Sequence, residues 1–218
     1  MAFSVYESSD ENAPQLNGQT GSLVALLDAV LVTGYGNRQP IGWLKPLPND
    51  SLTGSLGCWQ QPSGSRMVLY INDNAPTASI IGGGREAWAT GYETILGLTS
   101  SIFPTNGSGS GQFPLATQTF STQTIGGVAS ASVWWRKSAS ADNIPRYWIL
   151  FGDAYTFYLF VQTGDTTGTY YGYWFGDFYA YRASDTYRCT IHGRCGNQTN
   201  SLTYRLDGSD AGTMPTVT

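Results

Sequence analysis

The stretch GSLVALLDAVLVTGYG, residues 21–36, contains the pattern that decides the fold. It predicts a helix over about residues 22–33, with Ser22 as the N-cap and Gly34 as a left-handed residue that closes the last turn. A helix of about 12 residues is marginal alone, so it must pack on the rest of the chain. The side chains expected to make that contact recur at the i, i+3, i+4, i+7 and i+8 spacing of one helical face: Leu23, Leu26, Leu27, Val30 and Leu31.

The rest of the chain has the composition of a turn-rich β protein. Charged residues make up only 12%, whereas aromatic residues reach 14% and glycines number 27. Short apolar segments bounded by turn residues, such as 66–71 and 128–136, predict strands, and a further strand pair is expected around Ala87-Trp88-Ala89 and Tyr92. We therefore expect a mainly β fold, an antiparallel sandwich or a barrel-like sheet with one packed N-terminal helix. Residues 21–218 are predicted to form this single β-rich domain.

Residues 1–20 are predicted to form an N-terminal arm outside that domain. The polar, Pro- and Gly-containing stretch after the first few residues is too irregular for a core element. The segment is either a frayed terminus or an arm that becomes ordered against a neighbour, because it is more apolar than a free tail needs to be. The candidate docking residues in the arm are Val5, Tyr6 and Leu16.

Charge and cysteine content exclude several classes of protein. A formal net charge of −4 argues against binding nucleic acid through its phosphates. The longest apolar run, from Leu23 to Val32, is interrupted by Asp28 and is too short to cross a membrane. No signal peptide pattern is present, and three cysteines cannot build a disulfide framework. We expect neither nucleic acid nor membrane as a partner, and assembly in a reducing cytosol.

Two segments of the C-terminal third repeat the pattern Phe-Gly-Asp-x-Tyr-x-aromatic, at 151–157 and 175–181. Their aspartates, Asp153 and Asp177, could be the paired carboxylates of a glycoside hydrolase. The alternative is structural, because an Asp after Gly can accept hydrogen bonds from nearby amides in a bulge or turn. Since an acid and a base need different environments and these two share one local pattern, the structural interpretation is favoured.

Other candidate chemistry has weak support in the sequence. Cys189, His192 and Cys195 have a Cys-x2-His-x2-Cys spacing, which is not that of a common zinc site, so we predict no metal and no cofactor. A Ser-His-Asp triad has no motif support, and no phosphate-binding loop is present, so no enzyme is predicted. Four tryptophans and the tyrosines of 155–181 could form an exposed carbohydrate-stacking platform or fill the interior and the interfaces, and the second interpretation is favoured. The tryptophans are Trp134, Trp135, Trp148 and Trp174.

The pattern SDxxAPxLxGxxGSLxxLLDA over residues 9–29, followed by Gly34-Tyr35-Gly36 and Gly42-Trp43, resembles the N-terminal signature of a family of tailed-bacteriophage structural proteins. The strand at 66–71 and the Phe-Gly-Asp motifs agree with this resemblance, which covers most of the chain. It implies a non-enzymatic component of the virion and carries over no catalytic or ligand residue.

The expected function is that of a bacteriophage virion structural protein, either a capsid decoration or cement protein or a tail-associated assembly component. Its expected partners are other virion proteins and further copies of itself, and its location is the virion after assembly in the bacterial cytoplasm. The alternative is a tail protein that binds a receptor or glycan through exposed Trp and Tyr. A cryptic glycoside hydrolase is the third hypothesis. The three differ in where the aromatic side chains point.

Overall fold

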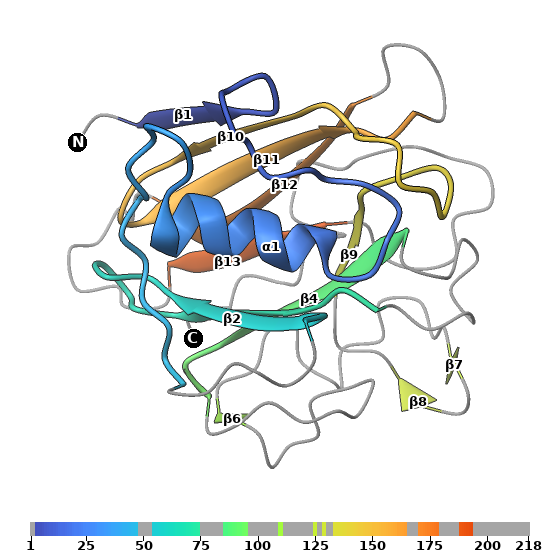
Figure 1. Ribbon diagram of the computed structural model, residues 1–218. Coiled ribbons are helices and arrows are strands. Elements are labelled where there is room, and N and C mark those ends of the chain that lie inside the picture. The colour runs from blue at the N-terminus through green and yellow to red at the C-terminus, as the bar shows by residue number, and fades with distance from the viewer. Residues whose placement is uncertain are drawn as a thin grey trace.

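The computed structural model describes residues 3–47, 54–74, 85–95, 133–164, 170–178 and 188–193, together with three two-residue strands (Figure 1). For those three strands and for Trp134 only the backbone is described. The described residues form two antiparallel sheets and one helix, which confirms the predicted mainly β fold. The sheets are separate and do not close into a barrel within the described part of the chain.

The first sheet has five strands in the order β1-β10-β11-β12-β13, with every neighbouring pair antiparallel. The three central strands follow one another in the chain, whereas β1 comes from the N-terminus. Their bounds are β1 (Ser4–Glu7), β10 (Trp148–Gly152), β11 (Thr156–Gln162), β12 (Tyr170–Asp177) and β13 (Cys189–His192).

The second sheet has four antiparallel strands in the order β2-β3-β4-β9. The strands predicted at 66–71 and around Trp88 correspond to β3 and β4, and the segment 128–136 contains β9. The bounds are β2 (Leu56–Gln60), β3 (Val68–Asn72), β4 (Glu86–Tyr92) and β9 (Val133–Arg136). Two short pairs complete the described strands: β5 (Thr94–Ile95) with β6 (Gly109–Ser110), and β7 (Thr124–Ile125) with β8 (Val128–Ala129).

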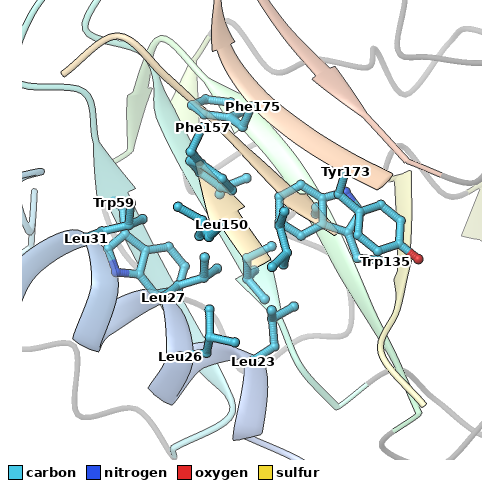
Figure 2. Packing of buried hydrophobic residues seen from close by; sticks show 14 of the residues in the cluster. Leu23, Leu26, Leu27, Leu31, Trp59, Trp135, Leu150, Phe157, Tyr173 and Phe175 are labelled. Carbon is cyan, nitrogen blue, oxygen red and sulfur yellow. The ribbon is translucent and has the colours of Figure 1, made fainter. Parts of the chain in front are cut away.

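The predicted helix is present over its expected range. α1 (Ser22–Asp28) continues directly into a π-helical turn, η1 (Ala29–Thr33). All five aliphatic side chains of the predicted face are buried in the core. The helix lies between the five-stranded sheet and β2 (Figure 1), and its leucines point toward Trp59 and Leu150 (Figure 2).

The ends of the helix differ from the prediction. Ser22 does not cap α1, because its hydroxyl donates instead to the carbonyl oxygens of Asn17 and Gln19. The backbone N–H of Leu23, in the first turn of α1, donates to the carboxylate of Asp73 at 2.9 Å. Asp73 directly follows β3, so a residue far away in the sequence supplies the acceptor that the N-cap side chain was expected to supply. Gly34 has the expected positive φ of 79°, but its ψ of 172° is extended rather than left-handed helical.

The two sheets share one hydrophobic core. Trp135 of β9 stacks on Tyr173 of β12 with ring centroids 5.3 Å apart, so the inner faces of the sheets are in direct contact. Trp43, in the extended segment after the helix, packs edge-on against Phe157 and Phe175 of the five-stranded sheet. The helix thus closes one side of a two-sheet core that is rich in aromatic rings.

The N-terminal segment belongs to the domain, which corrects the prediction of a separate arm. β1 pairs with β10 along its whole length. Tyr6 and Leu16 are buried in the common core, and the backbone N–H of Arg146 donates to the carbonyl of Leu16 at 2.7 Å. The docking role predicted for Tyr6 and Leu16 is therefore wrong, because neither side chain is accessible to a partner. Val5 is exposed.

Candidate interaction surface

The outer face of the five-stranded sheet, which points away from the core, carries several partly exposed aromatic side chains, of which Phe160 and Tyr170 are the most exposed. Side chains alternate across a strand, and the inward set of this sheet lies entirely in the core. We name the outward apolar set the aromatic outer face. Its members are Val5, Ile149, Phe151, Tyr158, Phe160, Tyr170 and Trp174.

The strand register aligns these side chains in rows across the sheet. One row runs from Val5 through Phe151, Tyr158 and Trp174 to His192, one residue from each of the five strands. Cross-strand neighbours of this kind lie within contact distance on a pleated sheet. The row therefore forms a continuous apolar band over β1, β10, β11 and β12, and it ends at the buried His192 of β13.

Ring contacts hold the members of the surface in place. Phe151 and Phe160 pack edge-on with centroids 6.1 Å apart, and Tyr158 packs against Trp174 at the same distance. Phe3, which precedes β1, adds a further ring 6.3 Å from Tyr158. These contacts rigidify side chains that still expose substantial area, since Phe160 is 39% exposed.

At the β13 end of the row, Trp174 is covered on one side. The His192 ring stacks on the indole with centroids 4.0 Å apart and planes 11° apart. The indole N–H donates to the hydroxyl of Thr190 at 3.1 Å. His192 itself is buried, and its Nδ1 lies 3.1 Å from the carbonyl oxygen of Gly172. One face of the indole is thus occupied by the protein itself.

The strands that carry the surface have few charged groups on the same side. Glu7 is the one carboxylate on the outward side of these five strands, and the hydroxyl of Tyr147 lies 3.4 Å from its Oε2. Tyr147 also packs edge-on against Tyr170, which is 49% exposed. The surface is therefore apolar at its centre, with a polar margin beside β1 and the start of β10.

The two Phe-Gly-Asp segments, which share one sequence pattern, have different environments. Asp153 lies in the turn between β10 and β11, where its carboxylate accepts hydrogen bonds from the backbone N–H groups of Tyr155 and Thr156 at 2.8 and 3.0 Å. This is the local role predicted from the sequence. The contacts support a structural function for Asp153.

Asp177, at the end of β12, makes contacts with distant parts of the chain. Its carboxylate accepts from the backbone N–H of Ser65 at 2.9 Å, from the hydroxyl of Ser65, from Nε2 of Gln61 at 3.1 Å and from Nε of Arg188 at 2.9 Å. The side chain is 4% exposed. Asp177 therefore joins the first sheet to the connection between β2 and β3, and its oxygens are occupied by protein donors.

The candidate metal ligands are not brought together. Cys189 and His192 both lie on β13, but Cys189 points into the core and His192 points to the outer face. Burial raises the pKa of the Cys189 thiol well above its usual value. Cys195 lies outside the described residues. Within the described ranges, no group of three or more His, Cys, Asp or Glu side chains is placed to hold a metal ion.

Most of the tryptophans fill the interior, as the favoured interpretation predicted. Five of them are buried, and Trp174 is the one described tryptophan side chain with intermediate exposure. The side chain of Trp134 lies outside the described part. The buried set is Trp43, Trp59, Trp88, Trp135 and Trp148. Phenylalanine and tyrosine, rather than tryptophan, thus dominate the aromatic outer face, and three of its members, Tyr158, Tyr170 and Trp174, belong to the aromatic set that the sequence offered as an exposed platform.

Because comparison with known proteins finds no match, the aromatic outer face is interpreted from its own geometry. No family model, curated protein or solved structure matches this chain. Among the helices of the described residues, none is long and apolar enough to cross a membrane.

Proposed function

We propose that this protein is a non-enzymatic structural component of a bacteriophage virion that assembles through the aromatic outer face of its five-stranded sheet. The single observation that carries the proposal is the continuous, partly exposed apolar row that Val5, Phe151, Tyr158 and Trp174 form across four of the five strands. Monomeric proteins rarely expose contiguous apolar patches of this kind, and such patches mark interaction sites. The placement of this function on a virion rests on the resemblance of residues 9–29 to the phage signature.

The chemistry of the surface favours a protein partner. Tyr, Phe and Trp are enriched in the centres of protein interfaces, where charged residues are depleted. Here the centre is formed by Phe151, Tyr158 and Phe160, and the carboxylate of Glu7 lies at the margin. Because the side chains stand on paired strands and contact one another, little conformational entropy is lost when a partner covers them.

The ring geometry favours a protein over a glycan. A sugar needs an open, flat ring face to stack on. Phe151–Phe160 and Tyr147–Tyr170 meet at interplanar angles of 82°, so ring edges cover ring faces between strands. One face of Trp174 is covered by His192. The resulting surface is uneven and suits the interdigitated side chains of a protein interface.

Accessory virion proteins need a rigid unit that repeats one contact many times. A docking surface on a regular sheet provides this, because paired strands fix the relative positions of its side chains. Capsid decoration is our first choice within this class, and a tail or collar position is the second.

The proposal is tested on particles produced from the genome that encodes this chain. Mass spectrometry of purified particles should detect the protein at a fixed stoichiometry, and cryo-EM should show its five-stranded sheet against a neighbouring protein. Absence from particles contradicts the virion assignment. Presence with the aromatic outer face turned to solvent contradicts the assigned surface. Binding of the isolated protein to host glycans, without incorporation, would favour the receptor-binding alternative.

A further inference from the structure

A lysine and an aspartate are buried together at the end of the second sheet. Asp73 directly follows β3 and Lys137 directly follows β9, and Nζ lies 2.5 Å from Oδ1. The lysine side chain is 1% exposed and the aspartate side chain 0%. In the sheet order, β4 lies between β3 and β9, so the pair bridges the two neighbours of β4.

Burial favours the uncharged forms of both groups. It raises the pKa of Asp73 to about 6 and lowers the pKa of Lys137. An uncharged amine is a nucleophile, and a protonated carboxyl group is a better acceptor of a nucleophile than a carboxylate. Burial therefore increases the populations of the uncharged amine and the protonated carboxylic acid, the forms in which the two groups can react.

Neighbouring groups fix both reacting partners. The backbone N–H of Leu23 donates to Oδ2 of Asp73 at 2.9 Å. Nζ of Lys137 donates to the carbonyl of Gln19 at 2.5 Å and to the hydroxyl of Ser22 at 3.0 Å. An N–H on Oδ2 lies where negative charge develops when the carboxyl carbon is attacked. Holding two reactants in contact also replaces a bimolecular encounter with an intramolecular step.

We propose that Lys137 and Asp73 form an intramolecular isopeptide bond. Nζ of Lys137 attacks Cγ of Asp73, the Nζ–Cγ bond forms and the Cγ–Oδ1 bond breaks. Oδ1 leaves with its own proton and one proton from Nζ as a water molecule. The step is a condensation without change of oxidation state, so it needs no oxidant, reductant or cofactor. Exclusion of water from the site slows the reverse hydrolysis.

The isopeptide bond would stabilise this domain as a covalent cross-link of the kind that disulfides provide in other proteins. Cys58 and Cys189 are buried, and neither forms a disulfide within the described residues. A link between the ends of β3 and β9 closes a long loop and restricts the unfolded chain, as a disulfide does, but it is insensitive to a reducing cytosol. This modification does not depend on the proposed docking surface, and either can fail without the other.

Intact-mass spectrometry of the denatured full-length protein tests the bond. The wild-type mass should fall below the sequence mass by one water molecule, and fragmentation of a protease digest should yield a branched peptide that joins Lys137 to Asp73. The variant Lys137→Arg keeps a cation at the site but cannot form the same bond, so it should show the full sequence mass. The wild-type measurement decides the proposal even where the variant fails to fold.

The chain supplies a matched internal control. Lys45 and Asp28 lie 2.7 Å apart, but their side chains are 25% and 39% exposed, and this pair should remain unlinked. A full sequence mass in folded wild-type protein overturns the proposal. So does a water loss that maps elsewhere, for example to a succinimide at Asp207-Gly208.

Discussion

The outer faces of the two sheets have similar chemistry and opposite exposure. On the four-stranded sheet, Cys58, Val68 and Tyr70 point away from the main core but are buried in a second cluster that includes Leu47 and Ile95. On the five-stranded sheet, the outward side chains of β10, β11 and β12 retain exposed area. An outward apolar row is therefore no evidence of docking by itself. What distinguishes the aromatic outer face is that, within the described part of the chain, its side chains remain partly uncovered.

The largest expected loss of stability comes from a Tyr→Ala substitution, which can be made on the outer face of each sheet. Tyr70→Ala removes a fully buried ring and should cost about 3–5 kcal/mol of unfolding free energy. Tyr158→Ala removes a partly exposed ring and should cost about 1 kcal/mol. Chemical denaturation of the two variants measures the difference. Equal losses would show that the two faces are equally covered.

The next largest loss of stability is expected at Asp177, whose carboxylate joins the first sheet to the connection between β2 and β3. Asp177→Asn leaves Arg188 without its anionic partner and should lower the free energy of unfolding by about 2–3 kcal/mol. The loss is this large because hydrogen bonds to charged groups are stronger than those between neutral groups. Asp153→Asn keeps one side-chain oxygen for its local turn and should cost about 1 kcal/mol or less. Thermal and chemical unfolding measure both. A polysaccharide-cleaving activity lost in either variant would instead support the hydrolase hypothesis.

The smallest change in stability is expected for a hydroxyl on the buried outer face of the four-stranded sheet. The Tyr70 hydroxyl is buried and has no hydrogen-bond partner among the residues that the structure describes. Tyr70→Phe removes only this group and should leave stability unchanged or raise it by about 1 kcal/mol. A clear loss of stability would mean that the hydroxyl has a partner, such as an ordered water, on this face.

The sequence predicts what depends on local pattern. The 3.6-residue spacing from Leu23 to Leu31 predicts the helix and its buried face correctly. Alternation predicts β3, β4 and the repeated strands of the first sheet. A π-helical turn at 29–33 has no comparable signal, because it differs from the α-helix only in that an N–H donates to the carbonyl five residues back instead of four, as the N–H of Gly34 does to Ala29.

The errors lie where residues far apart in the chain meet. Ser22 has the right residue type for an N-cap, yet the amide of Leu23 is satisfied by Asp73, 50 residues away. Asp73 itself lies in an Asn-Asp-Asn turn signal, and only the fold reveals that Lys137 is its neighbour. The wrong docking prediction for Tyr6 and Leu16 has the same cause, because the pairing of β1 with β10 cannot be predicted from residues 1–20 alone. The aromatic outer face likewise needs the register of five strands.

A substitution at the centre of the aromatic outer face tests whether the protein docks through this surface. Phe160→Lys places a charge at the centre of this surface, while Leu44→Lys makes the same kind of change at an exposed residue beside β2. Both variants should fold with near wild-type melting temperatures. We expect Phe160→Lys to be lost from purified particles, as measured by quantitative mass spectrometry, and Leu44→Lys to be incorporated at the wild-type copy number. Wild-type incorporation of Phe160→Lys would contradict docking through the aromatic outer face.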